Sequence, residues 1–144
     1  MDIDKILYNK KPFHQDDQEI MRMIIDLPGQ SVSVSELKKY TKKELEARGW
    51  IYPFRYHPKL SNTITAARDK TGLCLPLGNI ARLFYDLLKL QYCYSKNIIE
   101  RGIIICPIAP EGNRAYIERL DREMQIYLSV IDIPLCAIGT NIRG

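Results

Sequence analysis

The stretch 71-TGLCLPLGNIARLFYDLLKLQYCY-94 decides the fold that this sequence predicts. A short apolar run, Leu73 to Leu77, ends at Gly78-Asn79, and apolar residues then recur at three- and four-residue steps from Ile80 onward. This pattern is typical of a strand that leads into a helix. Because the helix carries apolar residues on more than one face, we expect it to lie between a sheet and another layer of structure.

A second strand is expected shortly after this helix. Residues 102–108, GIIICPI, are rich in β-branched side chains and apolar at successive positions, as in a strand that is covered on both faces. Strand, helix and strand together predict a βαβ unit with two parallel strands and a right-handed crossover.

Size and composition favour one domain, residues 1–144, with a substantial core, because the chain has 144 residues of which 46% are hydrophobic. No apolar segment approaches the roughly 20 residues of a membrane helix, and the N-terminus lacks the apolar core of a signal peptide. We therefore expect a soluble, cytoplasmic protein with no membrane partner. The net charge of +4 permits a polyanionic partner without requiring one.

The cysteines are expected to be reduced core residues, because they lie far apart in the sequence and three of the four sit inside apolar runs. They are Cys74, Cys93, Cys106 and Cys136. With two histidines and no close cysteine pair, a structural zinc site is not expected.

The N-terminal third predicts an arm and two helices. Residues 1–13 are expected to form an extended arm, since Pro12 bars a helix through its end. A first helix runs from Asp16 to the Pro28-Gly29 break. Ser33 and Glu36 form a capping-box pattern that opens a second helix at residues 35–48.

This second helix is rich in lysine. The cluster is either a face that contacts phosphate groups or a solvated face with helical ion pairs. The charge pattern alone favours the solvated face. Its lysines are Lys38, Lys39, Lys42 and Lys43.

An edge meander is expected next. Residues 50–57, WIYPFRYH, alternate aromatic and other side chains, but Pro53 restricts them to an edge strand or an extended loop. Aromatic residues interleaved with Arg55 could stack on nucleobases or pack the rim of the domain. Residues 63–67 are a second candidate strand.

The C-terminal part predicts one helix and one strand. Pro110 and Gly112 indicate a loop, and Asn113 can cap a helix from Arg114 to about Val130 that covers one face of the sheet. Residues 133–138 are expected to form the last strand, and 140–144 a tail.

This order of elements resembles the PD-(D/E)XK nuclease fold and, more narrowly, the BglII-type restriction endonucleases. The segments that carry the resemblance are LGNIARLFYDLLKLQYCY, KKELEARGW, GIIICPI, RAYIERLDREM and IPLCAIGT, within residues 37–140. The resemblance implies an α/β restriction-endonuclease-like core, a mixed β-sheet flanked by helices. It also implies a DNA-cleaving homodimer that uses a divalent metal, with an interface at the central helix or at residues 114–130.

The catalytic pattern of that family is not retained. It comprises an Asp, a Glu nine residues later and a Gln two residues after that. Alignment on Gly78-Asn79 places these positions at Thr65, Cys74 and Pro76. Mg²⁺ prefers hard oxygen ligands, so we predict a catalytically inactive nuclease that has no cofactor and retains duplex DNA binding. The candidate contacts to DNA are Lys38, Lys39, Lys42, Lys43, Arg55, Arg82 and Lys89.

Two alternatives remain open. In one, the fold serves only as a scaffold for a protein partner. In the other, the protein is an active Mg²⁺-dependent endonuclease whose acids have moved to Asp69 and Asp86, with Glu36 as a further candidate. Asp69 is also explained as a turn residue, and Asp86 by pairing with Arg82 or Lys89 on its own helix.

Overall fold

The predicted βαβ unit forms the centre of the structure, a computed structural model that describes residues 1–9, 13–109 and 115–143. It consists of β6 (Thr71–Cys74), α3 (Ile80–Ser95) and β7 (Arg101–Pro107). The two strands are parallel, with Leu73 opposite Ile103. β6 ends before Leu77 because Pro76 cannot donate a backbone hydrogen bond to a neighbouring strand.

The main sheet has the strand order β1-β8-β7-β6-β5. β7 lies parallel to β6 and to β8 (Leu135–Thr140), whereas the edge strands β1 (Ile3–Tyr8) and β5 (Ala66–Arg68) are antiparallel to their neighbours. A mixed sheet flanked by helices is the expected fold class, which is confirmed.

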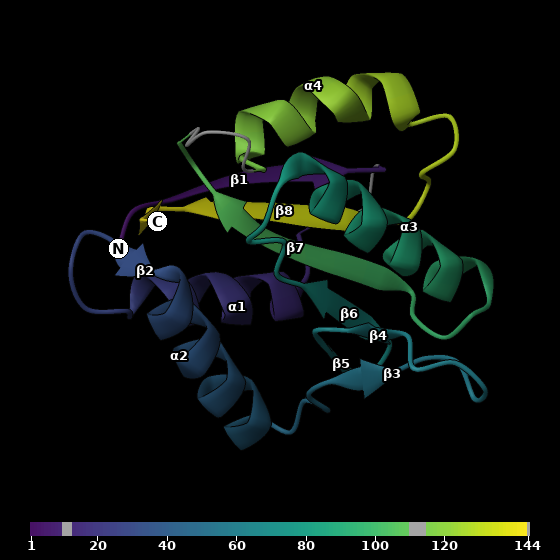
Figure 1. The fold of residues 1–144 in the computed structure, drawn as a ribbon, viewed down its shortest axis with the longest axis horizontal. Coiled ribbons are helices and arrows are strands. Elements are labelled where there is room, and N and C mark those ends of the chain that lie inside the picture. The colour runs from purple at the N-terminus through teal and green to yellow at the C-terminus, as the bar shows by residue number, and fades with distance from the viewer. Residues whose placement is uncertain (10–12, 110–114, 144) are drawn as a thin grey trace.

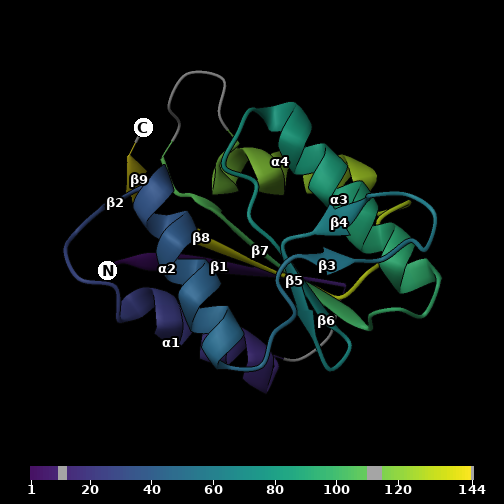
Figure 2. The ribbon, with the colours of Figure 1, turned by 60° about the horizontal axis from the view of Figure 1, so that its bottom comes forward.

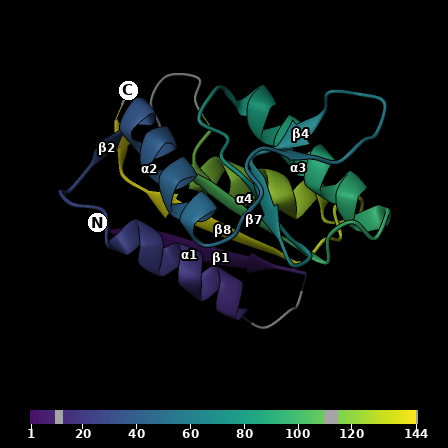
Figure 3. The same ribbon diagram turned by 90° about the horizontal axis from the view of Figure 1, so that it is seen from below.

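Helices cover both faces of this sheet (Figures 1 and 3). On one face α1 (Gln15–Ile25) and α2 (Val34–Ala47) pack over buried residues that include Leu73 and Ile103. On the other face α3 and α4 (Ile117–Tyr127) form a second core. The capping boxes of α1 at His14 and of α2 at Ser33 satisfy backbone N–H groups in their first turns.

Two small sheets complete the architecture (Figure 2). β3 (Phe54–Arg55) and β4 (Thr63–Ile64) form an antiparallel pair beside α3. β2 (Val32–Ser33) pairs in parallel with β9 (Ile142–Arg143). The C-terminal segment that was expected to be a tail is therefore partly a strand.

Two expectations need correction. Residues 3–8 of the expected N-terminal arm are a strand of the main sheet, because their backbone groups pair with β8. α3 is not enclosed on all sides, since Tyr85, Leu88 and Tyr92 on its outer face are exposed. Five residues that the sequence analysis used lie outside the described residues, namely Pro12, Pro110, Gly112, Asn113 and Arg114. The C-terminal helix, α4, begins at Ile117.

The four cysteines are free and buried, as expected. None of the helices in the described residues combines the length and apolar character that crossing a lipid bilayer requires.

Candidate nucleic-acid interface

A cleft of about 650 Å³ lies beyond the C-terminal end of β6, between α2 and the first turns of α3. Figure 3 shows α2 on one side of this region and α3 with β4 on the other. Polar residues from α2, from the β4–β5 segment and from the start of α3 line the cleft. They include Lys38, Thr63, Thr65, Asn79, Arg82 and Asp86.

The β5–β6 hairpin brings two of the predicted catalytic positions together. Ala66 pairs with Leu73, so Thr65 and Cys74 are the next residues along the two strands. The Thr65 hydroxyl faces the cleft and accepts a hydrogen bond from the Leu75 N–H at 3.1 Å. Thr65 therefore offers the cleft a neutral hydroxyl where the family pattern has a carboxylate.

Cys74 is buried behind the cleft. Burial raises the pKa of its thiol well above the ordinary value, and the nearby Asp86 carboxylate raises it further. The thiol is therefore neutral at physiological pH and a poor ligand for a hard cation. Pro76 is buried as well and does not line the cleft.

Asp86 is the one carboxylate among the described residues that line the cleft. It is almost fully buried, with its Oδ1 atom 3.4 Å from Arg82 Nε and 4.0 Å from Lys89 Nζ. Burial raises its pKa, and the two cations oppose this shift. The other proposed acid, Asp69, lies in the β5–β6 turn with a φ of 47° and is not part of the cleft lining.

These residues do not fit a Mg²⁺ site. Within residues 1–9, 13–109 and 115–143, no three His, Cys, Asp or Glu side chains are grouped so that they could hold a metal ion. Mg²⁺ is held by carboxylates and other hard oxygen ligands. No second carboxylate of the described residues lines the cleft beside Asp86, and two cations already lie close to it.

The cleft is suited to an anion instead. Lys38 and Arg82 line it with exposed side chains. The N-terminus of α3 also opens into it, where Asn79 caps the helix by accepting from the Arg82 N–H. Helix N-termini attract anions such as phosphate, because their free N–H groups and the helix dipole point toward the ligand.

The remaining basic candidates differ in their surroundings. Lys89 is buried, donates to the Thr63 carbonyl at 3.0 Å and lies over the Tyr85 ring. Arg55 donates from Nε to carbonyl groups of its own loop. Three more lysines are exposed on α2 outside the cleft lining, namely Lys39, Lys42 and Lys43.

Positive charge is concentrated in the segments that form this region. Residues 47–99 contain eight basic and two acidic residues, a net charge of +6, whereas the whole chain has +4. The remaining residues are therefore slightly acidic together. Two of the cations of residues 47–99, Arg48 and Arg68, pair with acids of α1 and α2, and the positive charge that remains in this range favours a polyanionic partner.

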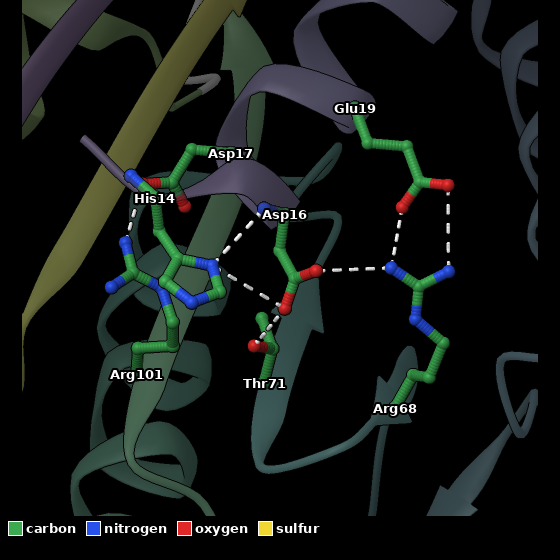
Figure 4. A network of polar contacts seen from close by, with 7 residues as sticks. All are labelled: His14, Asp16, Asp17, Glu19, Arg68, Thr71 and Arg101. Atoms are coloured by element: carbon green, nitrogen blue, oxygen red, sulfur yellow. Dashed lines mark hydrogen bonds and ion pairs between the residues drawn. The ribbon is translucent and has the colours of Figure 1, made fainter.

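A second polar cluster lies at the first turn of α1 and was not predicted from the sequence (Figure 4). Arg68 bonds Asp16 at 3.0 Å and Glu19 at 2.5 Å. The Thr71 hydroxyl donates to Asp16, and Arg101 pairs with Asp17. The cluster ties α1 to strands β5, β6 and β7 and lies apart from the cleft lining.

Comparisons with known proteins give one family. The model of the family described as restriction endonuclease BglII/BglIII matches residues 6–140. The crystal structure of restriction endonuclease BglII complexed with a DNA 16-mer is similar at a TM-score of 0.82 and 19% identity, covering 100% of this chain and 78% of that chain. Free BglII is similar at a TM-score of 0.72 and 20% identity, covering 97% and 79%. No curated protein sequence matches.

Proposed function

The chain belongs to the BglII/BglIII restriction endonuclease family, and on that premise we propose that it binds duplex DNA in the cleft without Mg²⁺-dependent cleavage. One observation carries the proposal. Among the described residues that line the cleft, Asp86 is the one carboxylate and two cations face it, while Lys38 and Arg82 are exposed at the lining. Such a site attracts phosphate but offers little to hold a metal.

The chemistry explains why binding and cleavage separate. Phosphodiester hydrolysis by metal nucleases needs a metal ion to polarise the phosphate and to activate water. Thr65 and Cys74 supply neutral groups, and neither stabilises the charge that develops on the phosphate. Lys38, Arg82 and the α3 N-terminus still neutralise the phosphates of an intact strand.

The test is duplex DNA binding across a salt series, with and without Mg²⁺, followed by inspection of the DNA for cuts. We expect affinity to fall steeply with salt and the DNA to remain intact. Arg82→Gln should weaken binding about tenfold and lower the salt slope by about one. Arg22→Gln is the matched control, because Arg22 is an exposed arginine on α1. This variant should leave the affinity and the salt slope unchanged.

Cleavage in Mg²⁺ would favour the alternative of an active nuclease with a relocated acid. Asp86 lines the cleft and Asp69 does not, so activity lost in Asp86→Asn and kept in Asp69→Asn would support that alternative. Cleavage activity that survives both substitutions would contradict the relocated-acid alternative and also the proposal that the protein is inactive.

We also propose a homodimer that forms through α3 and α4. Phe84 and Tyr127 meet edge to face, with ring centroids 6.0 Å apart, beside a hollow of about 270 Å³. Leu88 and Val130 at its rim are 64% and 66% exposed. Large exposed apolar patches are usually covered by a partner, and a two-fold dimer would cover this face with its own copy.

Sedimentation tests the dimer. Val130→Glu should convert a dimer into a monomer without unfolding it, because the side chain is exposed in the single chain. A monomeric wild-type protein that also fails to bind DNA at low salt would favour the scaffold alternative, in which this face binds another protein.

We also propose that the protein is cytoplasmic. The four buried free thiols are consistent with a reducing compartment.

A further inference from the structure

An aromatic groove of about 300 Å³ lies beside the cleft, on the outer face of α3. One wall is the α3 face that carries Tyr85, Leu88 and Tyr92, at three- and four-residue steps, and Leu88 also borders the proposed dimer face. The other wall is the β3–β4 loop, where Tyr56 lies 5.7 Å from Tyr92 between ring centroids. The groove therefore offers flat aromatic surfaces of a kind on which a planar ring can stack.

The loop wall is held in place by two of its own residues. Arg55 donates from Nε to the carbonyl groups of His57 and Leu60 at 3.3 and 3.0 Å. His57 Nδ1 accepts the backbone N–H groups of Lys59 and Leu60, both at 3.2 Å. A neutral imidazole that accepts at Nδ1 carries its proton on Nε2. His57 thus keeps a hydrogen-bond donor for a ligand in the groove.

Lys89 connects the groove to the cleft. It lines the groove, lies 4.2 Å from the centre of the Tyr85 ring and donates to the carbonyl of Thr63, which lines the cleft. Arg82 in the cleft precedes Lys89 by two helical turns, about 10 Å along α3. This separation is on the scale of one or two nucleotides of a DNA strand.

The groove also has the right charge for nucleic acid. The described residues that line it all come from the segment 47–99, which has a net charge of +6. Between Glu46 and Asp69 the chain has no acidic residue, while it includes Arg55 and Lys59. The β3–β4 loop therefore presents no carboxylate of its own to a polyanion that passes it.

We propose that the groove takes one unstacked nucleobase of the DNA strand whose phosphates bind in the cleft. The proposal rests on the proposed DNA binding and deepens it, because it names the preferred DNA as one with an unpaired or easily unpaired base. Tyr85 is 47% exposed, and Lys89 lies over one face of its ring, so in this proposal the base stacks on the other face. His57 Nε2 and the Asn62 amide at the groove can hydrogen bond its edge.

The experiment compares two short duplexes that share one sequence. One carries 2-aminopurine as a single-base bulge, and the other carries it paired with thymine. We expect the bulged duplex to bind about tenfold more tightly, as stacking of one base on an aromatic side chain predicts. The 2-aminopurine fluorescence should change on binding as the base moves from its DNA neighbours to the tyrosines.

Variants locate the effect. Tyr85→Ala should reduce the ratio of the two affinities to about one, and Tyr85→Phe should keep it, because stacking needs the ring and not the hydroxyl. Phe13→Ala is the matched control, since Phe13 is an exposed aromatic that precedes α1, far along the chain from the groove. Its ratio should equal that of the wild type.

The outcomes separate this inference from the proposed function. Equal affinities for both duplexes would overturn the nucleobase groove and leave DNA binding in the cleft standing. A Tyr85→Ala variant that keeps the ratio of the two affinities would also overturn the nucleobase groove. If the same variant dissociates a dimer, the groove binds a second copy of the chain instead. Failure to bind either duplex at low salt would overturn both proposals.

Discussion

Asp17 on α1 and Arg101 on β7 form an ion pair in the protein interior, although 84 residues separate them in the sequence (Figure 4). The Asp17 side chain is fully buried and that of Arg101 is 11% exposed. Asp17 also accepts the His14 N–H and so closes the α1 capping box. The pair therefore fixes the start of α1 against the central strand of the sheet.

Removal of one partner should be costly. Arg101→Met leaves a buried carboxylate without its cation, and we expect the free energy of unfolding to fall by about 3–5 kcal/mol. The double variant Arg101→Met, Asp17→Asn should regain much of this loss, because it removes the buried charge and keeps an oxygen for the cap. Urea unfolding of the two variants measures the difference.

A partly exposed arginine provides the control for this experiment. Arg119, whose side chain is 41% exposed, pairs with Glu123 at 2.9 Å on α4, and ion pairs that water reaches contribute little. Arg119→Met should change the free energy of unfolding by less than about 0.5 kcal/mol. A loss as large as that of Arg101→Met would mean that side-chain truncation, and not the buried charge, sets the cost.

Gly72 allows α3 and the β4 region to pack directly on β6. A Cβ atom at this position would lie 2.9 Å from Cδ1 of both Ile64 and Ile99 and 3.1 Å from Leu90 Cδ2. We expect Gly72→Ala to lower the free energy of unfolding by about 1–3 kcal/mol through overpacking. Thermal or urea unfolding measures it. Gly78→Ala is the control, because its Cβ would meet only ordinary contacts with Arg82.

The central unit was accessible from the sequence, because it follows from local patterns. The apolar run after Thr71, the Gly78-Asn79 break and the spacing on α3 predict β6, α3 and their parallel partner β7. The positions Thr65 and Cys74 come from the resemblance to the family pattern, aligned on the same break, and they adjoin the paired residues Ala66 and Leu73 of strands β5 and β6.

The ion cluster at α1 was not accessible, because long-range pairing carries no local signal. Asp16 and Asp17 look like ordinary first-turn acids of a helix, and Arg68 looks like part of a polar turn. The groove was missed for a similar reason. Apolar spacing on α3 does not distinguish Leu87, which is buried, from Leu88, which is exposed, since only the tertiary structure decides which helix face is covered.

The four thiols should be unreactive in the folded protein. Burial raises the pKa of Cys93 to about 11 and that of Cys106 and Cys136 to about 12, and it raises that of Cys74 well above the ordinary value. Only thiolates attack disulfide reagents. We expect no reaction with Ellman's reagent at pH 8 in buffer, and four thiols per chain in denaturant.

A single reactive thiol in the native protein would contradict this expectation. If Cys74→Ser abolished that reaction, the floor of the cleft would be open to reagents and Cys74 would be accessible from it. If another cysteine were responsible, local opening of the core that contains it would be the cause.

Asp86 should make stability depend on pH in a defined direction. Burial raises its pKa above the ordinary value of 3.8, so the folded protein holds this proton more tightly than the unfolded chain. As pH rises from about 4, the unfolded chain loses the proton first, and unfolding becomes more favourable. The contribution of Asp86 to stability is therefore complete below pH 3.8 and is lost as pH rises through the folded-state pKa.

The comparison that isolates this effect is between the wild type and Asp86→Asn, by urea unfolding at several pH values from 4 to 7. The free energy of unfolding of the wild type, relative to that of the variant, should decrease as pH rises. Arg82→Gln should extend this decrease to higher pH, because it removes a cation that lowers the Asp86 pKa. A relative stability that instead increases with pH would mean that Arg82 and Lys89 outweigh burial and hold Asp86 ionised.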